Sequence, residues 1–310
     1  MIGITMGDPN GVGPEIVVMG FSEGIFPEDS VVYGDATALG LAGEVLNLYD
    51  VAAQVTLVDC GTITRGDLEP GVLSKAAGRA SLEYVRRATE DTRAGKIDAI
   101  VTLPINKEAV GMSKPGFQGH TDYIAELCGI SDYSMMLASE RLAVAHVSTH
   151  VSLREAIDRV TPERVAVVAR LLSDTLSRFI PVPRIAVAGL NPHAGEHGAF
   201  GREDDEAIRP AVERLKKEGI TVEGPIPADT VFYKGFAGSY DGVVCMYHDQ
   251  GHIPMKTADF AGTVNVTLGL PIIRTSVDHG TAFDIAYQGT VDIGNAAAAY
   301  RYAERLLQRR

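Results

Sequence analysis

Residues 242–248 read Gly-Val-Val-Cys-Met-Tyr-His, an apolar run that stops abruptly at a histidine. An uninterrupted run of this kind is typical of a strand covered on both faces, whereas a half-exposed strand alternates apolar and polar residues. Residues 99–101, Ala-Ile-Val, repeat the pattern. The same criteria predict strands at 2–6, 31–33, 55–59, 99–103, 142–148, 184–190, 242–247, 264–268 and 272–276.

Helical patterns separate these strands. Thr161, Pro162 and Glu163 supply an N-cap, a proline in the first helical turn and an acidic residue at the positive end of the helix dipole. The sequence therefore predicts helices at 161–178, 74–93, 203–218 and 294–309. Alternating strands and helices are typical of an α/β protein with a parallel or mixed sheet. A chain of 310 residues is long enough for two lobes of about 150 residues each.

The chain is acidic, with 40 aspartates and glutamates against 28 lysines and arginines and a net charge of −12. This charge repels a phosphate backbone or an anionic bilayer, so the composition argues against nucleic acid and membrane partners. A few local cations can still bind a small anion. Three distant cysteines without a Cys-x-x-Cys motif favour a reducing compartment. Because we find no signal-peptide pattern and no apolar stretch of about 18 residues, we expect a cytoplasmic enzyme.

All eight histidines lie between positions 120 and 279, and six of them form three pairs spaced by four residues. In an extended chain four residues span about 13 Å, too far for both members of a pair to bind one ion. One histidine from each of three strand ends is a better ligand set: His150, His193 and His248. Three neutral imidazoles that leave an open position are what a catalytic divalent metal requires. The alternative is that each histidine caps a backbone carbonyl or packs at the surface.

Two acidic residues are further candidates for the chemistry. Asp249 follows His248 directly, and Asp229 ends the segment Pro-Ala-Asp. Each carboxylate could orient an imidazole or act as an acid or a base. The alternative is an ordinary loop carboxylate that caps a turn.

Two groups of residues are candidates to bind an anion. His120 and Thr121 precede an amphipathic run, and a threonine at a helix start suits an anion held by backbone N–H groups; the alternative is a simple N-cap. Lys256, Asn265 and Arg274 are spaced through the strand-rich region that follows His248. An ammonium, an amide and a guanidinium that converge would hold a carboxylate or a phosphate. Taken singly, each of these three is more often a solvated surface residue.

Residues 7–15, Gly-Asp-Pro-Asn-Gly-Val-Gly-Pro-Glu, join the first predicted strand to the first helix. The segment is neither a Gly-x-Gly-x-x-Gly dinucleotide fingerprint nor a Walker A loop. Gly11 and Gly13 could let a pyrophosphate or a pyridinium carboxamide approach the helix N-terminus. Near the end of the chain, His279 and Asp284 are candidates to bind an adenosine.

Taken together, five segments resemble the 4-hydroxythreonine-4-phosphate dehydrogenase family of vitamin B6 biosynthesis and its relatives that act on four-carbon acid-sugar phosphates. The segments occur in family order, and Asn-Pro-His-Ala-Gly-Glu and Tyr-His-Asp-Gln-Gly are the most specific. They are residues 7–15, 119–122, 190–196, 246–251 and 278–286. The first and last segments also resemble the isocitrate and isopropylmalate dehydrogenase superfamily, whose members oxidise β-hydroxy acids and then decarboxylate them.

The resemblance implies an α/β fold of two α/β/α lobes with the active site in the cleft, and we expect the lobes to comprise residues 1–117 with 262–310 and residues 118–261. It also implies NAD or NADP, bound without a Rossmann fingerprint. One divalent metal (zinc, cobalt, manganese or magnesium) is expected in a site shared by the two subunits of a homodimer. The matching metal ligands are His150, His193 and His248, and the matching substrate contacts are His120, Thr121, Lys256, Asn265 and Arg274.

One departure from the family pattern concerns the substrate. Biosynthetic members continue with a leucine-proline type of sequence after Tyr-His-Asp-Gln-Gly, whereas this chain continues with His252, close to Lys256. We therefore expect oxidative decarboxylation of D-threonate or D-erythronate 4-phosphate to dihydroxyacetone phosphate and carbon dioxide, with Asp249 or Lys256 as the base. The alternatives are 4-phosphohydroxy-L-threonine, which would give 3-amino-2-oxopropyl phosphate, and a metal-dependent aldolase or hydrolase without a dinucleotide.

Overall fold

The computed structural model describes residues 1–308, which form two compact units. The first unit comprises Met1–Ser131 and Leu270–Leu307, and the second comprises Asp132–Gly269. The chain enters the second unit at residue 132 and returns to the first at residue 270, whereas we expected these boundaries at 118 and 262. Both boundaries are later than expected because helix α6 packs on α4 of the first unit and strand β10 pairs with β5 of the second. Residues 309 and 310, which end the expected first lobe, lie outside the described residues, and so does the predicted helix end at 309.

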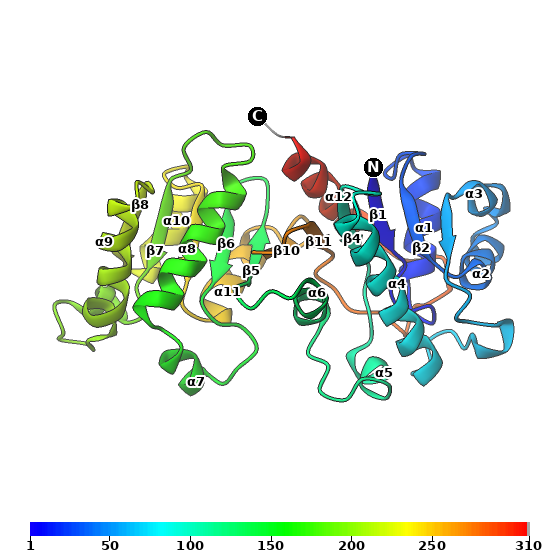
Figure 1. Cartoon of the computed structure of the whole chain (residues 1–310), viewed down its shortest axis with the longest axis horizontal. Coiled ribbons are helices and arrows are strands. Elements are labelled where there is room, and N and C mark those ends of the chain that lie inside the picture. Colours follow the sequence, from blue (N-terminus) through cyan, green and yellow to red (C-terminus); the bar gives the residue numbers. More distant parts are fainter. Residues whose placement is uncertain (309–310) are drawn as a thin grey trace. The chain divides into compact units, whose positions relative to one another are not determined.

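The first unit holds a parallel sheet in the order β3-β2-β1-β4-β11 (Figure 1). Its strands are β1 (Ile2–Thr5), β2 (Val31–Gly34), β3 (Leu57–Asp59), β4 (Ala99–Thr102) and β11 (Ile273–Ser276). Its helices are α1 (Gly13–Ser22), α2 (Ala36–Leu46), α3 (Tyr49–Gln54), α4 (Lys75–Arg93), α5 (Lys107–Gly111), α6 (His120–Cys128) and α12 (Gly294–Leu307), with a 3-10 turn at Arg65–Asp67.

Different helices cover the two faces of this sheet. The strand register places Tyr33, Thr102 and Ser276 on one face. The Tyr33 hydroxyl donates to α4, whereas the hydroxyl of Thr275, the neighbour of Ser276, donates to a carbonyl of α12. Arg274 precedes Ser276 by two residues, so its side chain points to the face covered by α4, where α6 also packs.

The second unit holds a mixed sheet in the order β10-β5-β6-β9-β7-β8. Strand β5 is antiparallel to both of its neighbours, and the remaining neighbours are parallel. The strands are β5 (Ser134–Ala138), β6 (Ala143–His146), β7 (Ile185–Ala188), β8 (Val222–Ile226), β9 (Gly242–Cys245) and β10 (Val264–Leu268). The helices are α7 (Leu153–Asp158), α8 (Pro162–Leu176), α9 (Arg209–Lys217), α10 (Ala228–Phe236) and α11 (His248–Ala258), with a 3-10 turn at Pro192–Gly195 and a π-helix at Asp204–Ile208.

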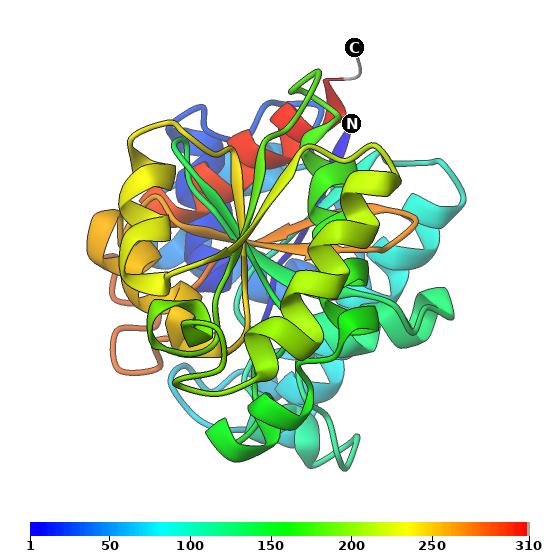
Figure 2. The same cartoon turned by 90° about the vertical axis from the view of Figure 1, so that its left-hand side faces the viewer.

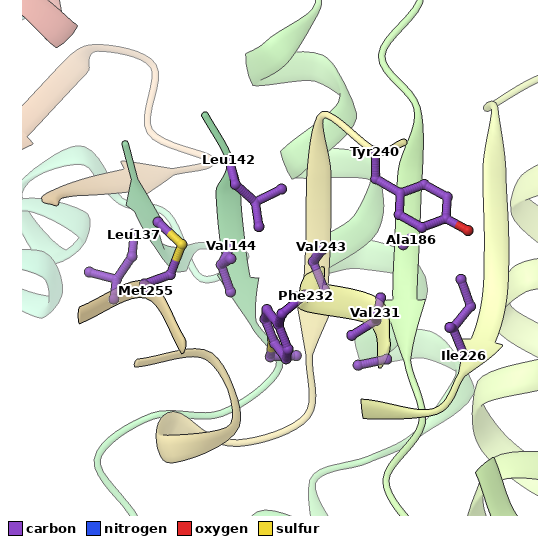
Figure 3. Packing of buried hydrophobic residues seen from close by; sticks show 12 residues of the cluster. Leu137, Leu142, Val144, Ala186, Ile226, Val231, Phe232, Tyr240, Val243 and Met255 are labelled. Carbon is purple, nitrogen blue, oxygen red and sulfur yellow. The ribbon is translucent and has the colours of Figure 1, made fainter. Parts of the chain in front are cut away.

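Helices lie on both faces of the second sheet as well. Figure 2 shows the green and yellow-green helices α8 and α9 on one side and the yellow and gold helices α10 and α11 on the other. Between α10, α11 and the strands lies a core of apolar side chains (Figure 3). Phe232 of α10 and Met255 of α11 are buried there against Val144 and Val243. Burying one such side chain stabilises the fold by roughly 1.5–3 kcal/mol.

All nine predicted strands are present, seven of them shorter than predicted, and the predicted α/β class is confirmed. The elements that were not predicted from the sequence are strands β5 and β8 and helices α2, α3, α5, α7, α10 and α11. Strand β8 contains Gly224 and Pro225, which normally interrupt strands, and is tolerated because it lies at the sheet edge. Helix α11 begins at His248 and was not predicted because Gly251 and Pro254 are both unfavourable inside a helix. Among residues 1–308 no helix combines the length and the apolar character needed to cross a bilayer.

Candidate active site

Strands β6, β9 and β7 are parallel neighbours, so their carboxyl ends lie at one edge of the second sheet. Each strand leads into a segment that carries one predicted metal ligand: His150, His248 and His193. In α/β sheets this edge is where ligands bind. The structure brings two of the three together, because the ring centroids of His150 and His248 are 5.8 Å apart.

The tautomer of His248 is set by its neighbour. Its Nδ1 lies 2.7 Å from Oδ1 of Asp249. Because a carboxylate oxygen accepts and Nδ1 must donate, Nε2 of the neutral ring keeps its lone pair. A carboxylate that orients an imidazole in this way is the usual partner of a metal-binding histidine. Asp249 is therefore placed to orient His248, which is one of the two roles considered for it.

His193 has an unusual backbone. It lies in the turn Pro192–Gly195 with φ +55°, and Ala194 follows with φ +54°, a left-handed conformation that costs non-glycine residues about 1–3 kcal/mol each. The buried carboxylate of Asp204 holds the start of this segment by accepting from both backbone N–H groups of Leu190 and Asn191. The His193 ring lies 6.1 Å from that of Phe200.

The three predicted ligands do not form a complete metal site in a single chain. Across residues 1–308 no three histidine, cysteine, aspartate or glutamate side chains converge closely enough to hold an ion. The donors themselves suit a metal, since two imidazoles are neighbours and one presents an oriented lone pair. A third ligand has to be added to them.

Four histidines, His146, His150, His248 and His252, form what we call the imidazole cluster. His248 and His252 stack with 3.5 Å between ring centroids and 11° between planes, and His146 lies 4.7 Å from His252. The expectation that members of a pair lie too far apart is wrong for His248 and His252, because α11 places residues four apart on one face. Burial lowers the pKa of His146 to about 3, so this ring is neutral at pH 7.

Gln250 connects two of the strand ends and was not predicted as a site residue. Its Oε1 accepts from the backbone N–H of Met246, after β9, and its Nε2 donates to the carbonyl of Gly189, after β7, both at 2.7 Å. The side chain is almost completely buried. Gln250 therefore sets the spacing between the segments that carry His248 and His193.

The first unit contains what we call the Arg274 cluster: Arg274, Thr102, Thr121 and His120. Arg274 is 2% exposed. Its guanidinium donates to Thr102 Oγ1 from Nε (3.1 Å) and Nη2 (2.6 Å), and to Thr121 Oγ1 from Nη1 (3.4 Å). Burial lowers the pKa of Arg274 to about 9, which leaves it charged at pH 7. This arrangement of a guanidinium and hydroxyl groups suits an anion, and it combines Arg274 with Thr121 of the other predicted group rather than with Lys256 and Asn265.

His120 in this cluster is neutral. Its pKa lies well below the usual value, first because of burial and then because of the positive charges of Arg274 and Lys107. Its buried Nε2 has no hydrogen-bond partner. An uncompensated buried nitrogen beside two cations is favourable only where a ligand group can approach it.

The loop at 7–15 is tightly packed. A Cβ on Gly11 would lie 2.9 Å from the Thr281 carbonyl oxygen, and one on Gly13 would lie 1.9 Å from that of Met6. Chain packing therefore accounts for both glycines without a ligand. Asp8 is fully buried, its Oδ2 has no hydrogen-bond partner, and burial raises its pKa to about 6.

The remaining predicted residues are more exposed. The Lys256 ammonium lies 5.3 Å from the ring centre of Phe260, and Asn265 donates to Met135 Sδ. Asp229 is exposed in the first turn of α10. His279 is exposed, with Nδ1 bonded to the carbonyl of Gly280, and Asp284 is also exposed.

Comparisons with known proteins extend over the whole chain. A protein of Cupriavidus necator named D-threonate 4-phosphate dehydrogenase is 45% identical, covering 100% of this chain and 98% of its own. The crystal structure of a 4-hydroxythreonine-4-phosphate dehydrogenase from Klebsiella pneumoniae is 41% identical with a TM-score of 0.89, covering 99% of both chains. A β-decarboxylating dehydrogenase from Thermococcus kodakarensis shares the fold, with a TM-score of 0.51 and 16% identity over 99% of this chain and 83% of its own.

A family model described as "Pyridoxal phosphate biosynthetic protein PdxA" matches residues 28–303. The family resemblance predicted from the five sequence segments is thereby confirmed. Since this model spans most of the chain and relatives match it from end to end, the chain belongs to the PdxA family.

Proposed function

We propose that this chain is a D-threonate 4-phosphate dehydrogenase that transfers hydride to NAD or NADP. The observation that carries the proposal is the similarity to a relative of that name along the whole chain. The Arg274 cluster adds independent support, because a buried guanidinium flanked by hydroxyl groups suits a substrate with anionic ends.

The proposed reaction oxidises the C3 hydroxyl of the substrate. A base takes the hydroxyl proton while the hydride on C3 passes to the nicotinamide, whose redox chemistry is the cofactor's own. The resulting 3-oxo acid loses its carboxyl group as carbon dioxide. The enolate that remains takes up a proton at C2, which gives dihydroxyacetone phosphate.

The chain's own residues divide these tasks. Asp249 is engaged with His248 Nδ1 and is best assigned as a positioning residue, which favours Lys256 over Asp249 as the base. Asp229 remains a further candidate for proton transfer. We assign His120, Thr121, Lys256, Asn265 and Arg274 to the substrate, and Gly11, Gly13, His279 and Asp284 to the cofactor.

We further propose that His150, His193 and His248 bind one divalent ion in a site that is completed in a homodimer. Support comes from the two neighbouring imidazoles and from the oriented lone pair on His248. Imidazole ligands suit zinc, cobalt or manganese better than magnesium. When bound, the ion would supply Lewis-acid polarisation of the substrate hydroxyl and stabilisation of the enolate.

A turnover panel tests the proposal. D-threonate 4-phosphate, D-erythronate 4-phosphate and 4-phosphohydroxy-L-threonine are incubated with NAD or NADP and a divalent metal, and nicotinamide reduction is followed by absorbance. Reduction with D-threonate 4-phosphate, together with stoichiometric dihydroxyacetone phosphate, is the expected result. Preferred turnover of the amino substrate would support the second candidate, 4-hydroxythreonine-4-phosphate dehydrogenase, which the name of the Klebsiella relative suggests. The expected cytoplasmic location is part of the proposal and is tested by cell fractionation.

A further inference from the structure

Lys107 is a charged side chain to which the proposed function assigns no role. It is the first residue of α5, and Asn106 fixes this helix start by accepting from the backbone N–H groups of Glu108 and Ala109, each at 3.0 Å. The helix start aims the lysine at Gly119. A Cβ on Gly119 would lie 3.5 Å from Cε and 3.7 Å from Nζ of Lys107.

The ammonium of Lys107 is not neutralised by the protein. Within residues 1–308 it forms neither an ion pair nor a side-chain hydrogen bond. Other charged side chains of this unit, such as Arg86 and Glu83 on α4, form ion pairs. An exposed lysine whose ammonium lies beside Gly119 without an acidic partner is available to a ligand.

The spot that Lys107 faces is already positive. Gly119 is the N-cap of α6 and supplies no side-chain cap, so the positive end of that helix dipole is not offset by a capping oxygen. The charges of Lys107 and Arg274 both act on His120, so their potentials overlap at this imidazole. His120 contributes a buried Nε2 without a partner at the same place.

We propose that Lys107 is an additional substrate-binding residue of the Arg274 cluster and that its ammonium binds the phosphate group of the substrate. The inference rests on the proposed function. A phosphate monoester carries about −1.5 to −2 charges at pH 7. Two cations and an uncapped helix start match the charge of a phosphate monoester. A carboxylate carries only one negative charge and would match them less well. Lysine also suits phosphate, because a point charge binds any of its oxygens.

The test compares Lys107→Met with Lys107→Arg and with Lys75→Met. Lys75 is a matched control, since it is an exposed lysine at the first position of α4, in the same unit. Lys107→Met is expected to raise the KM for D-threonate 4-phosphate by about 10- to 100-fold, the loss that one charge-assisted hydrogen bond produces. Its kcat and the KM for NAD stay within about threefold. Lys107→Arg keeps most of the affinity, and Lys75→Met changes neither parameter.

Binding of inorganic phosphate, measured by calorimetry, separates this inference from the proposed function. Weaker phosphate binding in Lys107→Met alone supports the assignment even if D-threonate 4-phosphate is not turned over, which would refute only the proposed function. The assignment is overturned by an unchanged KM and phosphate affinity in Lys107→Met, by a fall in kcat without a change in KM, or by an equal effect in Lys75→Met. Circular dichroism checks that each variant is folded.

Discussion

Replacing Gln250 with glutamate tests whether this side chain fastens two strand ends of the second unit. An ionised glutamate still accepts from the N–H of Met246 but cannot donate to the carbonyl of Gly189. The lost hydrogen bond costs about 1 kcal/mol, and burying the unpaired carboxylate and carbonyl adds about 1–3 kcal/mol. We therefore expect Gln250→Glu to lower the free energy of unfolding by about 2–4 kcal/mol at pH 8.

The sign of the pH dependence makes this prediction specific. A protonated glutamate has the same shape as glutamine and can donate to Gly189, so the loss disappears once the group is neutral. A penalty of about 3 kcal/mol corresponds to a folded-state pKa about two units above the unfolded value near 4.3. The variant therefore approaches wild-type stability as the pH falls toward about 4, and the full deficit is present above about pH 6.5.

Urea denaturation of both proteins between pH 4.5 and pH 8 measures this difference. Gln288→Glu is the matched control, because exposed Gln288 makes the same kind of bond, from Nε2 to the carbonyl of Asp284 at 2.8 Å. Its effect should stay within about 0.5 kcal/mol at every pH. A Gln250→Glu deficit that does not change with pH, or one no larger than that of the control, would refute the role assigned to Gln250.

Three further predictions concern single side chains. Arg274→Lys should raise the KM for D-threonate 4-phosphate at least about tenfold, since an ammonium cannot reproduce the hydrogen bonds from Nε, Nη1 and Nη2. An unchanged KM in steady-state kinetics would show that Arg274 does not bind the substrate. His193→Ala should lose bound metal, measured by atomic emission after dialysis, with an unchanged circular dichroism spectrum, and full retention of metal would contradict the ligand assignment. Burial raises the pKa of Asp8 to about 6, so the stability of the wild type falls as the pH rises from about 4 to about 6. The asparagine of the Asp8→Asn variant does not titrate. The stability of Asp8→Asn relative to the wild type should therefore rise by roughly 1–3 kcal/mol between pH 4 and pH 7. A difference in urea denaturation that is independent of pH would show that the carboxyl of Asp8 is not the cause.

The elements that could be predicted from the sequence are those whose pattern is local. Continuous apolar runs identified the buried parallel strands, and capping residues identified α8 at Thr161. Strand β5, Ser-Met-Met-Leu-Ala, lacks the β-branched residues that mark a strand, and its place between β10 and β6 is decided by tertiary packing. The helix at His248 was missed for the same reason, because its glycine and proline weaken the local signal that packing against β6 and β5 overrides.

The candidate site shows the same division. The expectation that chemistry gathers at strand ends predicted that His150, His193 and His248 lie together, and in the single chain only His150 and His248 do. It could not predict the left-handed backbone at His193, which depends on Asp204 eleven residues later in the chain. The role of Gln250 could not be predicted either, because both of its hydrogen-bond partners are backbone atoms at the ends of strands that become neighbours only on folding.

The net charge of the chain affects an extended polyanion and a small anionic ligand differently. A net charge of −12 repels an extended polyanion, which meets the whole surface. A small dianion responds to charges within about 8 Å, the screening length at physiological salt. At that range the Arg274 cluster presents a buried guanidinium, and Lys107 adds an ammonium that no acidic side chain of residues 1–308 neutralises. The acidic composition that argues against nucleic acid is therefore compatible with a phosphate ester as substrate, and it predicts that raising the ionic strength weakens phosphate binding in the wild type more than in Lys107→Met.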